Sequence, residues 1–184
     1  LEIPQLQMEG YGGKAELKGA LDFKAKEPSY HVEGECRGMD LGLYLSRSEE
    51  KPSKTLEGAL DLKGNLEGTG WGAEAWSRSL KGQGDFTLSS GKFLSFDLSQ
   101  SLAAIEPLKG IGTLAPDLKA FDTMNFQWKI LDGKVVTDNL LVKAKDYVLD
   151  GEGTLGFDGL ANFRMDVFFS SALAPKLLPE LIHP

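Results

Sequence analysis

The sequence has little of what enzymes, redox proteins and metal sites use. Its 184 residues include one cysteine and two histidines. The single cysteine, Cys36, can form neither an internal disulfide nor a zinc site, so we interpret it as a small buried apolar residue. His31 and His183 have no partners arranged as a catalytic set, and no cluster of His, Cys and carboxylates has metal-ligand spacing. We therefore predict a protein that is not an enzyme, with no catalytic residues, no bound metal and no cofactor.

Two further absences concern partners. The net charge is −7, and lysine and arginine alternate with acids instead of clustering, which excludes a nucleic-acid partner. The chain also lacks an apolar run long enough to span a bilayer and an N-terminal signal. Because it begins at Leu1 without a methionine, we expect it to be cut from a larger protein whose membrane anchor lies outside this chain.

The chain does contain a repeated strand pattern. Residues 17–24 recur in degenerate form at 56–63, and residues 80–88 recur at 149–157. Each copy alternates apolar and polar residues, with glycine near its centre, and this period of two is typical of a strand with one apolar face. The acids within these patterns fall on the polar side, so a solvated sheet face explains them better than an acid/base pair. The pattern predicts two loosely repeated parts, about 1–79 and 80–170, within one domain covering 1–184.

Turn residues and apolar spacing place the elements along the chain. We expect an elongated, twisted, antiparallel meander, mainly β, with a partly open apolar face and a few short helices. Asp40 should cap a short helix, and Asp132-Gly133 and Asp158-Gly159 should form hairpin turns. The expected strands are 3–9, 14–26, 29–38, 55–67, 80–89, 92–96, 121–131, 134–144, 147–157 and 160–169; the expected helices are 40–45, 73–78 and one from 97 to about 105.

Aromatic residues on the apolar face bear on whether it is a closed core or a binding surface. Phe126 and Trp128 share one side of their strand with Met124 and Ile130. Such a face is either the closed core of a packed sheet or an open groove for lipid acyl chains, and the pattern leaves both readings open. A groove without polar anchors would bind by apolar area, at about 25 cal/mol per Å², without selecting head groups. Glycines at strand centres, such as Gly19 and Gly82, fit either sheet curvature or the close approach of a ligand.

The order of short motifs is similar to that of the C-terminal region of the AsmA family of bacterial envelope proteins, whose larger relatives include TamB. The resemblance covers nearly the whole chain, with departures at Ser95 and in the loop 46–54. The motifs are Tyr11-Gly12-Gly13, Arg37-Gly38-Met39-Asp40-Leu41, Leu56-Glu57-Gly58-Ala59-Leu60, Ser79-Leu80-Lys81-Gly82-Gln83-Gly84, Ser90-Gly91-Lys92-Phe93, Phe96-Asp97-Leu98, the stretch from Phe126 to Asp138, and Leu149-Asp150-Gly151-Glu152-Gly153.

This resemblance implies a periplasmic segment of a Gram-negative envelope protein that is anchored in the inner membrane. It further implies phospholipid transport between the inner and outer membranes, outer-membrane biogenesis, and neighbouring β-groove segments of the parent protein as partners. The alternative is a scaffold that supports outer-membrane protein assembly and carries no lipid. The residues that we expect to line the apolar surface, and to contact phospholipid acyl chains, are Leu17, Leu21, Phe23, Leu60, Leu62, Phe126, Trp128, Leu155 and Phe157.

Overall fold

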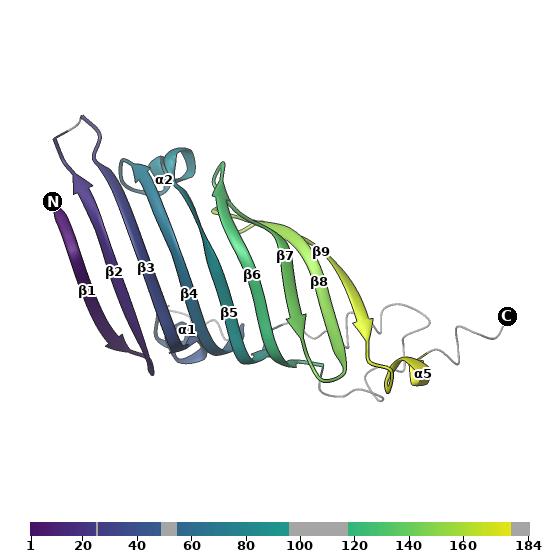
Figure 1. Cartoon of the computed structure of the whole chain (residues 1–184). Coiled ribbons are helices and arrows are strands. Elements are labelled where there is room, and N and C mark those ends of the chain that lie inside the picture. Colours follow the sequence, from purple (N-terminus) through teal and green to yellow (C-terminus); the bar gives the residue numbers. More distant parts are fainter. Residues whose placement is uncertain (25, 49–54, 96–117, 178–184) are drawn as a thin grey trace.

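The fold is one open sheet of nine antiparallel strands in sequence order (Figure 1). The computed structural model describes residues 1–24, 26–48, 55–95 and 118–177. Short helices lie at the ends of strands, and the mainly β meander predicted from the sequence is confirmed. The elements are β1 (Glu2–Gly10), β2 (Gly13–Asp22), β3 (Ser29–Asp40), α1 (Leu41–Ser48), β4 (Leu56–Thr69), α2 (Ala73–Ser79), β5 (Lys81–Phe93), β6 (Ala120–Leu131), β7 (Lys134–Lys143), β8 (Tyr147–Gly156), β9 (Ala161–Phe169) and α5 (Ala174–Leu177).

Several local signals in the sequence form the predicted structures. The Oδ1 atom of Asp40 accepts a hydrogen bond of 2.8 Å from the backbone N–H of Leu43, which caps α1 as predicted. Asp132 and Gly133 both have positive φ, at 50° and 71°, in the tight turn between β6 and β7. This backbone conformation twists in the same sense as the flanking strands, which is why Asp-Gly favours such hairpins.

The strand register brings apolar side chains into line across the sheet. Leu60 pairs with Leu88, Leu88 with Met124, and Met124 with Val142. The line continues through Leu149 to Val167 on β9. We call these six residues the closed row: Leu60, Leu88, Met124, Val142 and Leu149 are at most 8% exposed, and Val167 packs against them.

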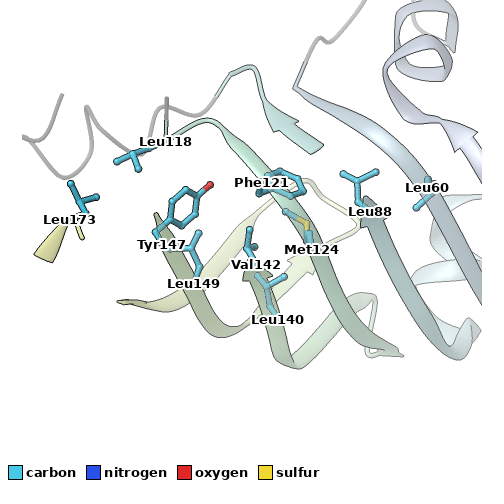
Figure 2. Close-up of a cluster of buried hydrophobic side chains, with 10 residues drawn as sticks. All are labelled: Leu60, Leu88, Leu118, Phe121, Met124, Leu140, Val142, Tyr147, Leu149 and Leu173. Carbon is cyan, nitrogen blue, oxygen red and sulfur yellow. The ribbon is translucent and has the colours of Figure 1, made fainter. Parts of the chain in front are cut away.

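The remaining core residues surround one end of the closed row (Figure 2). Leu118 and Phe121 come from the start of β6 and the residues before it, whereas Leu173 follows β9. Tyr147 is 2% exposed, and its hydroxyl donates to the carbonyl oxygen of Ala120 at 3.3 Å. The core therefore lies near one end of the strands, over β4 to β9, and not over the whole apolar face.

A bulge keeps β7 apolar on the same face along its whole length. The register of β6 against β7 shifts between Asn125 and Lys129, so that Val135 and Val142 lie on the same face although they are seven residues apart. The Oδ1 atom of Asn139 accepts the backbone N–H of Gln127 at 2.8 Å, which satisfies a group that the shifted ladder leaves unpaired.

Some of the expected strand and helix boundaries differ from those in the structure. The turn predicted at Gly91, with a separate strand 92–96 after it, is wrong, because β5 runs unbroken to Phe93. Gly91 is in the strand because the ring of Phe121 covers the space where a side chain would be. The second strand ends at Asp22, four residues earlier than predicted. The helix expected from 97 lies outside the described residues.

Candidate functional site

Along β4 and β8 the apolar face becomes more exposed with distance from the closed row, whereas Ile130, at the far end of β6, is only 6% exposed. Along β4, Leu60 is 5% exposed and Leu62 is 37% exposed; along β8, exposure rises from 2% at Leu149 to 45% at Leu155. Six large side chains of this face, each more than a third exposed, form what we call the open field: Leu6, Met8, Leu62, Leu155, Phe163 and Met165. The face thus combines a sealed core with an uncovered apolar surface.

Most of the residues that the sequence analysis chose lie on this face. Leu62 and Leu155 belong to the open field, whereas Leu17 and Leu21 are half-buried on β2. Leu60 is buried in the closed row, so it supports the core and is not accessible to a ligand in this structure.

Two of the chosen residues lie beyond the strands. Phe23 follows the end of β2 and is 57% exposed, and Phe157 follows the end of β8 and is 44% exposed. Both therefore belong to the turns at one end of the sheet. The two chosen aromatic residues on β6, Phe126 and Trp128, are half-buried on the apolar face.

Trp128 lies over a line of glycines that sequence reasoning did not identify. Gly34 pairs with Gly64, Gly64 with Gly84, and Gly84 with Trp128. A Cβ atom built on Gly64 would lie 2.5 Å from the indole Cζ2 atom, and one on Gly84 would lie 2.6 Å from it. The indole therefore fills the space that these glycines leave. The sequence signal that could have indicated this packing is a glycine near the centre of each of three successive strands.

Other strand glycines are covered in the same way by side chains of the protein. A Cβ atom built on Gly151 would lie 3.0 Å from Cγ of Met165, and the ring of Phe163 covers Gly153. The flat positions that the sequence suggested for a ligand are thus partly occupied by neighbouring side chains. Phe86 and Phe126 also stack, with ring centroids 4.4 Å apart. Aromatic side chains thus pack against the backbone and against one another over the middle of the apolar face.

Two polar atoms on this face are buried without a partner among the described residues. They are the indole N–H of Trp128 and the hydroxyl of Tyr30. The ring of Tyr30 stacks on Trp71 with centroids 5.4 Å apart, and burial raises the pKa of its hydroxyl. An unmade hydrogen bond on a buried donor costs about 1–3 kcal/mol. Both atoms are shielded from solvent, so a bound molecule could reach either donor only after neighbouring side chains move.

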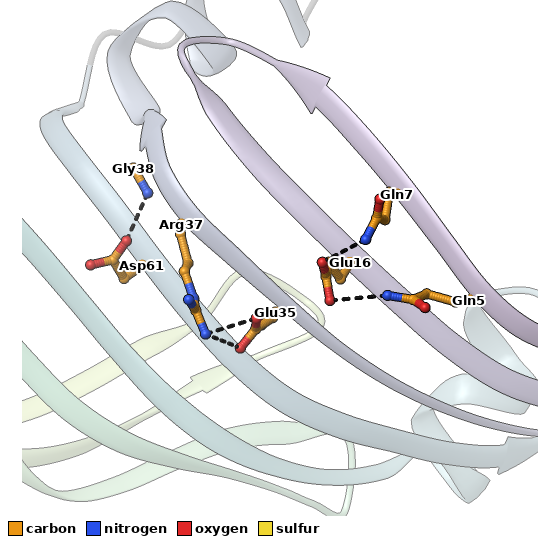
Figure 3. A network of polar contacts seen from close by, with 7 residues as sticks. All are labelled: Gln5, Gln7, Glu16, Glu35, Arg37, Gly38 and Asp61. Atoms are coloured by element: carbon orange, nitrogen blue, oxygen red, sulfur yellow. Dashed lines mark hydrogen bonds and ion pairs between the residues drawn. The ribbon is translucent and has the colours of Figure 1, made fainter.

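The opposite face is polar and tied together by side-chain contacts (Figure 3). Glu16 accepts hydrogen bonds from Gln7 at 2.8 Å and from Gln5 at 3.4 Å, and Arg37 pairs with Glu35 at 2.9 Å. The carboxylate of Asp61 accepts the backbone N–H of Gly38 at 2.7 Å, where the register of β3 shifts. These contacts join β1 to β2 and β3 to β4 on their solvated side, and the Arg37–Glu35 pair lies within β3.

A hollow of about 690 Å³ opens on this polar face, over β1 to β5. Charged side chains, including Glu16, Lys18, Glu35 and Lys63, line it. The hollow is therefore on the face opposite to the one that the sequence analysis proposed as a groove. The uncovered apolar surface is defined by the exposure of its side chains and not by this hollow.

Two neighbouring basic side chains on the polar face stabilise the ionised form of Glu33. Its carboxylate lies 2.8 Å from Nζ of Lys18 and 3.4 Å from Nε2 of His31. The hydrogen bond from Lys18, followed by that from His31, lowers the pKa of the Glu33 carboxyl. These groups are exposed, so the pairs contribute little to folding.

Within the described ranges, no group of three or more His, Cys and carboxylate residues is placed to hold a metal ion. None of the helices described there is long and apolar enough to cross a membrane. No family model matches the chain, and neither a curated protein nor a solved structure matches it.

Proposed function

We propose that this chain is a non-enzymatic segment of an AsmA-like envelope protein that shields lipid acyl chains. In this proposal the parent protein is anchored in the inner membrane of a Gram-negative bacterium, and this segment lies in the periplasm. Its apolar face forms part of a longer hydrophobic surface along which phospholipids move between the membranes. The observation that carries the proposal is the open field, where large apolar side chains remain uncovered next to a sealed core.

The chemistry of the open field fits an acyl chain. Its members are flexible or aromatic apolar side chains, such as Leu62, Met165 and Phe163, and each buried CH₂ of a ligand contributes about 0.8 kcal/mol. Acyl chains need no polar partner along most of their length, as this surface provides none.

The two edges of the sheet support a place within a longer assembly. β1 and β9 each pair with one strand only, so the outer backbone groups of both are without a strand partner in the described sheet. Such edges are templates for further strands. Neighbouring segments of the parent protein could pair with β1 or β9 and extend the apolar face in both directions.

These free edges also favour the alternative function, a scaffold that pairs with other proteins during outer-membrane assembly and carries no lipid. In that case the apolar face would be covered by protein. The two functions differ in one measurable property, which is whether phospholipid occupies the open field.

The test is to purify the chain from a Gram-negative host, extract it with organic solvent and quantify phospholipid by mass spectrometry. We expect bound phospholipid in the wild type. The double variant Leu62→Glu/Leu155→Glu places charges on exposed positions of the apolar face and should lose it. Leu60 is unsuitable for this test because it is buried in the core.

A control puts one of these glutamate charges on the other face. Phe168 is 57% exposed and points to the polar side of β9, so Phe168→Glu should keep the bound phospholipid. Circular dichroism should show the same strand content in all three proteins. Wild-type protein free of lipid, or equal loss in the control, would contradict lipid shielding and favour the scaffold.

A further inference from the structure

One end of the sheet has a rim of exposed apolar side chains on its turns. Phe23 follows β2, Trp71 precedes α2 and Trp76 lies in it. The other members are at the end of β6 and in the β8–β9 turn, at the same end of the sheet (Figure 1). These six residues, which we call the turn rim, are between 42% and 73% exposed: Phe23, Trp71, Trp76, Leu131, Phe157 and Leu160. We propose that the turn rim is a membrane-contact site that inserts these side chains into the interface of a lipid bilayer.

Backbone contacts hold the turns of the rim side by side. The N–H of Gly70 donates to the carbonyl oxygen of Pro28 at 2.8 Å, which joins the β2–β3 turn to the one before α2. The N–H of Phe157 donates to the carbonyl oxygen of Gly133 at 2.9 Å, which joins the β6–β7 and β8–β9 turns. The rim is therefore a preformed arrangement and not a set of independent loops.

Helix α2 is fixed between these two pairs of turns. The hydroxyl of Ser79 donates to the carbonyl oxygen of Thr69 at 2.7 Å, and the N–H of Thr69 donates back to that hydroxyl at 3.0 Å. On its other side, a Cβ atom built on Gly133 would lie 3.2 Å from the carbonyl oxygen of Ser77. Trp76 is therefore presented outward from a helix that is itself held against the sheet.

The residue types of the rim favour a bilayer over a protein partner. Tryptophan with phenylalanine and leucine, beside lysine, is the combination found where proteins meet the membrane–water interface. Each turn presents only one or two large apolar side chains, separated by polar residues. Separate tips can each enter a fluid interface, whereas a folded protein partner needs a contiguous complementary surface.

The charge of the rim fits the same partner. Residues 22–28, 69–81, 131–134 and 157–160 contain five basic and five acidic residues, so the rim is neutral while the whole chain carries −7. The strongly acidic remainder would be repelled by anionic lipids, but the rim would not. Lys24 and Lys134 lie next to the apolar tips, where their ammonium groups can reach lipid phosphates.

The inference does not depend on lipid shielding by the open field, and its test separates the two. Co-sedimentation with phosphatidylcholine vesicles, with and without one fifth phosphatidylglycerol, should show binding of the wild type to both. Since the rim is neutral, the two partition coefficients should agree within about twofold. The triple variant Phe23→Ser/Trp76→Ser/Leu160→Ser changes three separate tips and should bind at least tenfold more weakly.

The other end of the strands offers a matched control. Tyr11, Leu43 and Tyr44 are 36–40% exposed there, and Tyr11→Asn/Leu43→Ser/Tyr44→Ser should keep vesicle binding within twofold of the wild type. Equal loss in both triple variants, or a wild type that does not bind vesicles, would overturn the proposal. So would concentration-dependent self-association that the rim variant abolishes, because the rim would then be a protein interface.

A fluorescence measurement checks which side chains enter the bilayer. Vesicles of brominated phosphatidylcholine should quench the tryptophan emission of the wild type. They should quench Trp71→Phe/Trp76→Phe, which retains only Trp128, much less. The open-field variant Leu62→Glu/Leu155→Glu should still bind vesicles even if it loses co-purified phospholipid. Failure of the open field and failure of the rim therefore give different results.

Discussion

The glycine line beneath Trp128 gives the sharpest test of the packing. An alanine at position 64 would place its Cβ atom 2.5 Å from Cζ2 of Trp128 and 2.6 Å from the carbonyl oxygen of Gln83. Both distances are shorter than real Cβ contacts, so the indole and the neighbouring strand must shift. Gly34 lies in the same register line, but its nearest atom, the carbonyl oxygen of Glu16, would be 3.2 Å from the added Cβ. Gly34→Ala is thus the matched control.

The two substitutions should differ clearly in stability. Overpacking of this kind costs about 1–3 kcal/mol, so we expect Gly64→Ala to lower the free energy of unfolding by about 2 kcal/mol. For a chain of this length that corresponds to a decrease in Tm of roughly 4–8 °C. Gly34→Ala requires a much smaller adjustment. Alanine also restricts the unfolded chain, which stabilises by about 0.4–1 kcal/mol, so the net change should be within about 0.5 kcal/mol of zero.

Urea unfolding followed by circular dichroism measures both free energies. In a Trp71→Phe/Trp76→Phe background Trp128 is the only tryptophan, and Gly64→Ala should shift its emission to the red as the indole leaves the glycines. Removing the indole with Trp128→Ala should then reduce the cost of Gly64→Ala by about 1 kcal/mol, the coupling expected of residues in contact. Equal costs for the two alanines, with unchanged emission, would refute the packing described for Trp128.

Three further predictions follow from the core, a cap and an ion pair. Leu88 is fully buried, so Leu88→Ala should lower the free energy of unfolding by about 3 kcal/mol, whereas Leu62→Ala in the open field should lower it by about 1 kcal/mol. Thermal unfolding compares the two variants, and equal losses of stability would contradict the division of the apolar face into a buried and an exposed part. Asp40→Ala should cost about 1 kcal/mol by removing the cap of α1, and Asp40→Asn should restore most of it; equal destabilisation by both would exclude capping as the cause. The hydrogen bond from Lys18 lowers the pKa of Glu33 below its ordinary value of 4.5, so this carboxylate stabilises the fold fully above pH 4.5 and progressively less as the pH falls through its folded-state pKa. Lys18→Met should raise that pKa in an NMR titration, and an unchanged titration would show that the pair does not form in solution.

Local patterns predicted most of the fold because each strand has its own signals. Strict alternation fixed the faces of β2, and Asp-Gly placed the β6–β7 turn. Gly91 was misread because a glycine after a strand usually indicates a turn, whereas here it makes room for the ring of its cross-strand partner Phe121 on β6, which is remote only in the sequence. The shift in β7 was also missed, although Asp138 and Asn139 in mid-strand belong to residue types that strands disfavour.

The site was harder to predict because exposure depends on what packs across strands. Leu60 and Leu62 have the same pattern in the sequence, yet one is buried and the other is open. Both align with apolar residues across the sheet, Leu60 with Leu88 and Leu62 with Phe86, but Leu60 belongs to the buried core cluster and Leu62 does not, which no single strand reveals. Alternation thus identifies the apolar face, but only the packing of residues from several segments, such as Leu118 and Leu173, tells which part of it is buried.

The open field is a consequence of the register and cannot be removed by a small rearrangement. A slip of one residue in β2 would bring Glu16 and Lys18 onto the apolar face and make Leu17 and Leu21 point into solvent. The sheet would then still expose apolar side chains, and it would also place charged groups among apolar ones, which is unfavourable. The closed row is anchored on five adjacent strand pairings, so the sheet cannot slide as a whole either. A molecule that covers the face would remove the open field from water, and this is why the lipid measurement on Leu62 and Leu155 tests the function directly.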